Sequence, residues 1–150
     1  MSLPSADELE QLQEIEKQWA VKAMHHAETY FSLLEAMDGS KLKLTKIDDE
    51  IYVDFMSTFR SDFKIDVLDE AKDFKSPEMK EKWRSFINKY EGGKVTDYNF
   101  GSLLRIDASK EYSEDNTIFV TRMQFLTIEI ARNKAGLNSV HFKPKPKKAA

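Results

Sequence analysis

The stretch from Glu114 to Lys134 reads EDNTIFVTRMQFLTIEIARNK and, wound as a helix, is apolar on most of its circumference. A helix that is apolar nearly all round packs at the centre of a domain. Ser113 or Asn116 can cap its start, and a basic last turn followed by Gly136 favours an end near Lys134. We therefore predict a central, buried helix over residues 114–134, with the rest of the chain packed around it.

A long first helix is predicted over about residues 6–37. Ser5 and Glu8 have the spacing of a capping box, and apolar residues recur every three or four positions from Leu12 to Met37. Gly39 is expected to take a positive φ after the last turn. At 1.5 Å per residue the helix would be about 48 Å long. That exceeds what a compact domain needs, so we expect a kink near residues 20–27 or an overhanging N-terminus.

Two further helices are well marked, and two segments are not. One helix begins at Thr45, where three acidic residues follow in the first turn. Another begins at Ser76-Pro77 and ends at Gly92-Gly93. Residues 66–74 suggest a short helix capped by Asp66. Residues 95–106 alternate like a strand, but no strong partner strand is visible, so an irregular segment or a short helix is preferred.

Composition limits the class of protein. The chain of 150 residues is one domain, with 41% hydrophobic and 33% charged residues and no cysteine. The lack of cysteine excludes disulfides, thiolate metal sites and thiol catalysis. No apolar run approaches the roughly 20 residues of a membrane helix. Acids throughout the first thirty residues exclude a secretory signal. A cytoplasmic location is expected, with the nucleus as a second one.

The charge is uneven along the chain. Residues 137–150 hold four lysines and no acid, so the remainder carries 19 basic and 26 acidic residues, a net of −7. An acidic body holds a phosphate backbone poorly, because Lys and Arg supply that affinity. We expect a basic protein partner and no specific nucleic acid.

No cofactor, metal or catalytic residue is expected from the motifs. The adjacent His25 and His26 point about 100° apart, whereas a metal pair on one helix needs a spacing of three or four. Gly92-Gly93-Lys94 lacks the first glycine and the Ser/Thr of a phosphate loop. No dinucleotide fingerprint follows a strand. The aromatic residues on apolar stripes are expected in the core: Trp19, Phe55, Trp83, Phe86 and Phe119.

Arg84, Arg105 and Asp107 interrupt segments that otherwise look buried. A buried arginine requires a partner. Two interpretations stay open for these residues: an internal Arg–carboxylate pair that holds a loop, or contact with a partner protein.

Several strings occur in order and in register with one family: Trp19-Ala20, Ala23-Met24, His26-Ala27-Glu28, Leu42-Lys43-Leu44-Thr45-Lys46-Ile47-Asp48-Asp49-Glu50-Ile51-Tyr52, Ile65-Asp66-Val67-Leu68-Asp69, Lys80-Glu81-Lys82-Trp83-Arg84, Leu103-Leu104-Arg105 with Asp107, Asn116-Thr117-Ile118-Phe119 and Ile128-Glu129-Ile130-Ala131-Arg132-Asn133. With them the chain resembles the eukaryotic family of polysaccharide biosynthesis domain-containing protein 1. The resemblance covers about residues 19–138. It leaves residues 1–18 as an N-terminal extension of helix one and residues 139–150 as a disordered Lys/Pro tail.

The resemblance implies a mainly α fold, a compact orthogonal bundle of about five helices with at most minor β content. It also implies a dedicated chaperone. Because no ATP site or catalytic motif is visible in the sequence, we expect this chaperone to be ATP-independent and not an enzyme, and we expect a monomer. Its client would be the nascent GTP-binding domain of translation elongation factor 1-alpha, and ribosome-associated factors are further partners. Among the matched positions, the polar or half-exposed ones are expected to bind the client: Lys46, Asp48, Asp49, Tyr52, Arg84, Arg105 and Asp107.

Three alternatives stay open. The family name suggests a polysaccharide-modifying enzyme, such as an O-methyltransferase, although no cofactor loop supports it. A general protein-interaction adaptor fits the same composition. A nucleic-acid adaptor that uses the Lys-Pro tail rests on four lysines alone.

Overall fold

The computed structural model describes residues 6–59 and 63–145 and is mainly helical, with a small two-stranded sheet. The expected cap at Ser5 and the tail residues 146–150 lie outside the described residues. The elements in chain order are α1 (Ala6–Ala36), η1 (Gly39–Lys41), α2 (Asp48–Phe59), η3 (Ala71–Lys75), α3 (Pro77–Asn88), β1 (Gly101–Arg105), η4 (Glu114–Asn116), β2 (Thr117–Thr121), α4 (Arg122–Lys134) and η5 (Ser139–His141).

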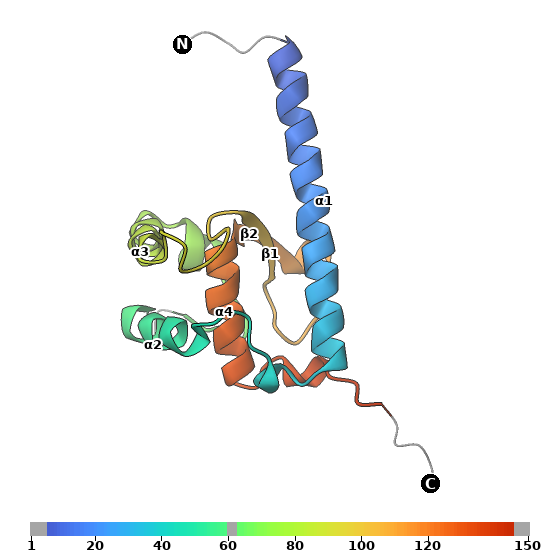
Figure 1. Ribbon diagram of the computed structural model, residues 1–150, viewed down its shortest axis with the longest axis vertical. Coiled ribbons are helices and arrows are strands. Elements are labelled where there is room, and N and C mark those ends of the chain that lie inside the picture. Colours follow the sequence, from blue (N-terminus) through green and yellow to red (C-terminus); the bar gives the residue numbers. More distant parts are fainter. Residues whose placement is uncertain (1–5, 60–62, 146–150) are drawn as a thin grey trace.

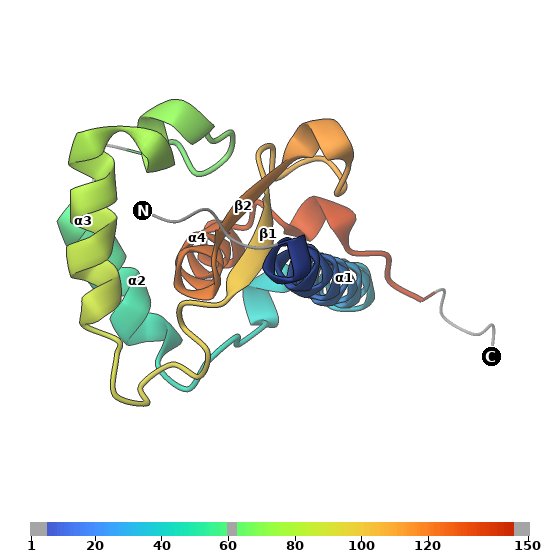
Figure 2. The same cartoon turned by 90° about the horizontal axis from the view of Figure 1, so that it is seen from above.

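Helix α4 lies between the α2–α3 pair and α1 (Figure 2). Helices α1 and α4 run along one direction, and α2 and α3 run across it, so the fold is the expected orthogonal, mainly α arrangement (Figures 1 and 2). The N-terminal part of α1 projects beyond the other elements, as the length of that helix predicted (Figure 1). The β1–β2 ribbon packs between α1 and α4. No helix in the described part of the chain has the length and apolar character that crossing a membrane requires.

An aromatic cluster fills the space between α2, α3 and η3. The rings of Phe59 and Trp83 have centroids 4.5 Å apart, and the ring of Phe74 stacks on Trp83 at 5.6 Å. The indole N–H of Trp83 donates to the carbonyl of Asp73 at 3.0 Å, so its only polar group is satisfied despite burial. The core positions predicted for Phe55, Trp83 and Phe86 are confirmed.

The single helix predicted over 114–134 is wrong in its first third. Residues 117–121 form β2, and α4 begins only at Arg122. Within β2, Ile118 and Val120 are buried while Phe119 faces outward with 53% of its surface exposed. Thr121 starts the helix, since its side chain accepts from the backbone N–H of Gln124 and the Gln124 side chain accepts from the Thr121 N–H. The β-branched residues of TIFVT favour a strand before this cap.

The irregular segment or short helix preferred for residues 95–106 is wrong for residues 101–105, which form β1, whereas residues 95–100 consist of turns and bends. β1 pairs antiparallel with β2 in the register Gly101↔Thr121, Leu103↔Phe119 and Arg105↔Thr117. The partner strand lay inside the stretch interpreted as helix, which is why no partner was visible in the sequence. The alternation that hinted at a strand was therefore the better signal.

Three local predictions need smaller corrections. Residues 66–74 do not form the short α-helix that was expected. Val67 forms an isolated antiparallel β-bridge with Asp107, and a π-helical turn follows at Ala71–Lys75. Helix α2 begins at Asp48 instead of Thr45. Gly39 does not take a positive φ. A Cβ there would lie 2.7 Å from Oδ1 of Asn133, so close packing explains the glycine. Ser76 caps α3 as predicted.

The C-terminal segment is more ordered than a tail. Ser139–His141 form the 3-10 helix η5, and His141 is only 9% exposed. The backbone N–H of Lys143 donates to the carbonyl of Glu35 at 2.8 Å. The disorder expected from residue 139 is therefore wrong for residues 139–143, because these residues pack on the end of α1.

Candidate functional site

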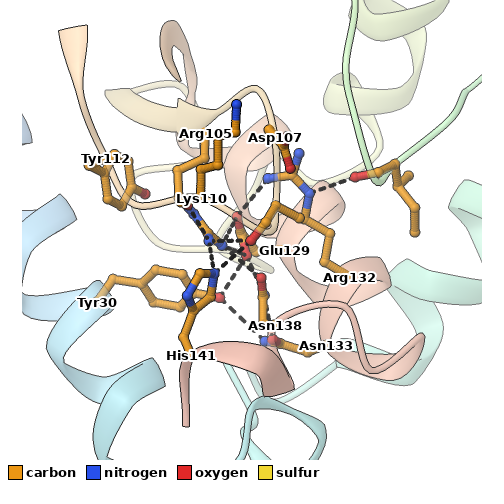
Figure 3. A network of polar contacts seen from close by, with 12 residues as sticks. Tyr30, Arg105, Asp107, Lys110, Tyr112, Glu129, Arg132, Asn133, Asn138 and His141 are labelled. Carbon is orange, nitrogen blue, oxygen red and sulfur yellow. Dashed lines mark hydrogen bonds and ion pairs between the residues drawn. The ribbon is translucent and has the colours of Figure 1, made fainter. Parts of the chain in front are cut away.

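A buried ionic centre joins α1, β1, α4 and η5, and consists of Tyr30, Arg105, Glu129, Arg132, Asn133, Asn138 and His141 (Figure 3). The Glu129 carboxylate is its hub. It accepts from Arg105 at 3.2 Å, from Arg132 at 3.1 Å, from the Tyr30 hydroxyl at 2.9 Å and from the Asn138 amide at 2.8 Å. Both arginines and Glu129 are fully buried. A buried carboxylate is tolerated in such a position because its charge and lone pairs are satisfied.

The two arginines also hold loops to this centre. Arg132 donates from Nε to the carbonyl of Ile65 at 2.7 Å and from Nη2 to the carbonyl of Ile106 at 3.0 Å. Arg105 donates from Nη1 to the carbonyl of Ala108 at 2.8 Å. These bonds fix the segments before η3 and after β1, which have little regular structure of their own.

The electrostatics of the centre favour a structural role. Burial opposes the charge on Glu129, but the guanidinium groups of Arg132 and Arg105 outweigh burial, and the pKa of this carboxyl is lowered. Burial and the neighbouring Glu129 carboxylate raise the pKa of the Tyr30 hydroxyl. The internal Arg–carboxylate pair is thus what the structure shows for Arg105. Its side chain has no exposed surface with which to contact a partner.

Four of the seven expected client-binding residues lie together at the start of α2. Lys46, Asp48 and Asp49 line a cavity of about 370 Å³ beside the end of α4. Asp49 forms an ion pair with Lys134, and the Lys134 ammonium lies 5.4 Å from the ring centre of Tyr52. These contacts place Tyr52 beside the cavity.

Asp48 has a different role from its neighbours. Its carboxylate accepts from the backbone N–H groups of Leu44 and Thr45, both at 2.7 Å, and from the Thr45 hydroxyl at 2.6 Å. It therefore holds the loop before α2, and the Thr45 hydroxyl in turn accepts from the backbone N–H of Ile47 at 3.0 Å. Asp49 is 91% exposed and is the acidic residue of this group that is open to a partner.

The other expected site residues lie elsewhere. Arg84 is exposed on α3, where it lines a different cavity with Asn88 and Gln124. Asp107 lies in the turn after β1, where hydrogen bonds from Ser109 lower the pKa of its carboxyl. Asp107 lies near Arg105 and Arg132 (Figure 3). Neither Asp107 nor Arg84 lines the cavity at the start of α2.

The structure has a second open surface that the sequence analysis did not predict. An apolar groove of about 430 Å³ lies between α1 and the ribbon, and we refer to it as the α1–ribbon groove. Met24, Leu103, Tyr112 and Phe119 line it. Met24 is 50% and Phe119 53% exposed. Phe119 lies between two other apolar residues, Ile118 and Val120, so the sequence pattern does not reveal its outward position.

Trp19 borders this groove instead of joining the core. Its ring is 38% exposed and stacks on Phe119, with centroids 5.0 Å apart. The core positions predicted for Trp19 and Phe119 are therefore wrong. Glu28 and Glu114 are the charged residues at the rim of the groove. An apolar surface with an acidic rim suits an apolar segment that carries basic residues.

The histidines His26 and His141 lie in different surroundings. Among the residues that the structure describes, no group of three or more His, Cys, Asp or Glu side chains could hold a metal ion. His26 packs edge-on against Phe125 at 5.1 Å. His141 lies in the ionic centre, with Nε2 at 2.7 Å from the carbonyl oxygen of Ala108.

Fold and site define a class: a mainly helical domain with a buried ionic centre and two open surfaces, one charged and one apolar. The family model described as PBDC1 protein matches residues 15–143 of this chain. The chain belongs to this family, the polysaccharide biosynthesis domain-containing proteins.

Named relatives extend the comparison. Protein PBDC1 of Mus musculus is 52% identical over 125 residues, which cover 83% of this chain and 62% of the mouse protein. The human protein is 51% identical, and the match covers 52% of its length. The Saccharomyces cerevisiae homologue is 49% identical over 140 residues, 92% of this chain and 95% of its own. The names carry no enzymatic designation.

A solved structure shares the fold. The solution NMR structure of a Saccharomyces cerevisiae protein has a TM-score of 0.77 with this chain at 50% identity. It covers 92% of this chain and 95% of the yeast chain. The chain thus spans nearly all of the yeast protein but under two thirds of the mouse and human proteins.

Proposed function

We propose that this protein is a client-specific, ATP-independent chaperone for the nascent GTP-binding domain of translation elongation factor 1-alpha. It acts as a monomer in the cytoplasm, with the nucleus as a second location, and it catalyses no reaction. Membership of the family and the resemblance of its matched strings support the choice of client. The α1–ribbon groove is the structural observation that carries the proposal, because a holding chaperone needs an open apolar surface.

The groove is suited to an unfinished client. Met24 and Phe119 are both about half exposed and lie in one apolar groove. Soluble monomers seldom expose neighbouring apolar side chains unless that surface binds a partner. A nascent domain exposes apolar segments that its own folding later buries. The client therefore leaves when it folds, which supplies release without ATP, provided the chaperone binds the unfinished form better than the finished one.

The acidic side chains of the surface support the same partner. Glu28 and Glu114 at the groove, and Asp49 at the start of α2, attract basic segments and speed encounter. Lys46, Asp49 and Tyr52 form a second contact for the client, while Asp48, Arg105 and Arg132 maintain the fold behind it.

The test is capture of nascent chains from a translating lysate by the tagged full-length protein. We expect selective recovery of ribosomes that synthesise elongation factor 1-alpha. The double variant M24E/F119E should reduce this recovery at least roughly tenfold, because two buried carboxylates in an apolar contact are costly. V140E is the matched control, since Val140 is 68% exposed on η5 and lines neither the groove nor the cavity at the start of α2.

Two outcomes would contradict the proposal. Equal binding of mature and nascent elongation factor would indicate a general adaptor. The same conclusion would follow if the M24E/F119E variant captured as many nascent chains as the natural sequence. A rise in melting temperature with S-adenosylmethionine or nucleotide sugars would revive a polysaccharide-modifying enzyme. Loss of capture only on removal of residues 143–150, with strong salt dependence, would favour the nucleic-acid adaptor.

A further inference from the structure

A further cavity lies between α1 and the start of β1, on the side of α1 that faces the first residues of the ribbon. Its volume is about 320 Å³, and we refer to it as the Lys22–Arg122 pocket. Its principal lining side chains are Trp19, Lys22, His26, Phe100, Ser102 and Arg122. None of the residues that line it is acidic, although acids outnumber bases in the chain as a whole.

The fold brings the basic groups together from two elements. Lys22 and His26 are four residues apart on α1 and share one face of the helix. Arg122 is the first residue of α4, and its backbone N–H donates to the carbonyl of Phe100. The N–H of Met123 donates to the carbonyl of Tyr98 at 2.8 Å, so the start of α4 is fixed beside the start of β1.

The positive charge in this pocket has no counter-ion among residues 17–59 and 63–145, whose side chains the structure describes. In the described residues, no carboxylate forms an ion pair with Lys22 or Arg122. Nε of Arg122 and Nδ1 of His26 are buried and have no hydrogen-bond partner. Buried polar atoms without partners are rare and call for an explanation. Burial, and after it the charge of Arg122, lower the pKa of His26, as expected for an imidazole held in a positive environment.

We propose that the Lys22–Arg122 pocket binds a phosphate group. Two permanent cations match the roughly −1.5 to −2 charge of a phosphate monoester near neutral pH. The guanidinium fork of Arg122 suits phosphate oxygens, and the Ser102 hydroxyl offers a further donor. The volume admits a phosphate with a small attached group. Phe100, which is 60% exposed, and Trp19 provide an apolar rim for that group.

The charged groups of this site are separate from the surface of the proposed chaperone activity, although Trp19 lies between the two and contacts Phe119. The α1–ribbon groove is lined by apolar side chains and uses a different face of α1, with Ala20, Met24 and Ala27 on its wall. The phosphate site uses Lys22 and His26. A variant of Lys22 should therefore bind phosphate poorly and still capture the nascent client, which separates the two proposals experimentally.

The experiment is an NMR titration of the full-length protein with inorganic phosphate and with phenyl phosphate, at constant ionic strength. We expect saturable shifts of the Trp19 indole and the His26 ring, and an increase in the pKa of His26 when phosphate is bound. The Trp83 indole, buried and bonded to Asp73, should not shift. K22Q and R122Q should each weaken binding roughly tenfold or more, since each removes a charge-assisted contact.

R84Q is the control, because Arg84 is exposed on α3 outside the pocket. It should leave the affinity unchanged. Tighter binding of phenyl phosphate than of phosphate would assign the site to an organic phosphate, and equal binding would assign it to the free ion. Shifts that grow linearly without saturation, or that are the same in K22Q as in the natural sequence, would overturn the proposal. K22Q decides the matter even if R122Q folds poorly, because Lys22 is exposed.

Discussion

At the scale of single residues, Glu129 matters most to this fold. It is the one carboxylate between two fully buried arginines, and it also accepts from Tyr30 and Asn138. A buried ion pair adds little when compared with a well-packed apolar core, but removal of one partner leaves an uncompensated charge. Substitution at Glu129 should therefore affect the stability of the whole domain.

The first prediction is that Glu129→Gln lowers the free energy of unfolding by about 3–5 kcal/mol. The amide keeps the shape of the side chain but leaves Arg105 and Arg132 without a counter-charge. Urea unfolding followed by circular dichroism measures the loss. Glu91→Gln is the matched control, because Glu91 is exposed and a change there should stay within about 0.5 kcal/mol. A similar small loss for both variants would contradict the role of Glu129.

The second prediction concerns acid. The pKa of Glu129 is lower in the folded protein than its usual value of 4.5, so the folded state binds this proton less well than the unfolded state. The stabilisation is thus complete above about pH 4.5 and is lost as the pH falls through the folded-state pKa. Unfolding free energies measured from pH 7 downward should decline in this window.

Other carboxyls contribute to the same decline. Hydrogen bonds from Ser139, Lys134 and Ser109 lower the pKa values of Asp38, Asp49 and Asp107 respectively. These groups lie at the surface, where solvent screens them. A comparison with Glu129→Gln isolates the buried group, and the variant should show a shallower decline. Parallel pH curves would contradict the prediction.

Arg105 shows how far single residues could be predicted. The sequence signalled that a charged residue amid Leu103, Leu104 and Ile106 would need a partner, and the structure supplies one. It could not name Glu129, because that residue was 24 positions away on what seemed an apolar helix face. Composition alone also gave no means of separating Asp48, which holds a loop, from the exposed Asp49.

At the scale of elements, the helices were predictable and the ribbon was not. Helices α1, α2 and α3 have one apolar face each, so periodicity located them to within a few residues. β2 ends at Thr121 and α4 begins at Arg122, so no linker separates the two elements. Apolar residues are so frequent across both that they fit a helical period as well as a strand period. Periodicity cannot distinguish a buried strand from a buried helix in such a run. The Thr121–Gln124 cap was the local signal that divides them.

The third prediction tests how the ribbon meets α1. Gly101 lies against the Trp19 ring so closely that a Cβ would fall 1.4 Å from Cζ2 of Trp19. Gly101→Ala should therefore displace the indole from its stack on Phe119 and lower the unfolding free energy by about 1–3 kcal/mol. A red shift of tryptophan fluorescence would report the displacement, since Trp83 stays buried.

A double-variant cycle makes this prediction specific. In the background of Trp19→Ala, where the clash is gone, Gly101→Ala should change stability by less than about 0.5 kcal/mol. If the alanine costs the same with and without the indole, its effect comes from the strand and not from the contact with α1.

At the scale of the whole molecule, the C-terminal segment completes the ionic centre. Asn138 donates to Glu129 at 2.8 Å and to Asn133 at 2.7 Å, and it accepts from Arg105 at 2.7 Å. Ser139 donates from its hydroxyl to Asp38 at 2.6 Å. The segment after α4 is therefore part of the domain, although its sequence resembles the start of a tail.

The fourth prediction separates these residues from those beyond them. A chain that ends at Leu137 should lose at least about 3 kcal/mol of stability, because three hydrogen bonds to buried groups disappear. A chain that ends at Phe142 should lose much less, since it keeps Asn138 and gives up only the backbone hydrogen bond of Lys143 to Glu35 and an ion pair that solvent screens. Urea midpoints of the two truncations measure the difference, and equal midpoints would contradict it.

The contacts of the ionic centre also set an order of events during synthesis. Tyr30 and Glu129 are 99 positions apart, and Asn133 reaches back 103 positions to the same hydroxyl. Chains grow at roughly 5–20 residues per second, so α1 emerges several seconds before the segment that covers it. Pairings so distant in sequence form late and slowly. This protein therefore completes its own fold only after Asn138 has been synthesised. Until then its own apolar segments stay exposed, which is the hazard from which it is proposed to shield a client.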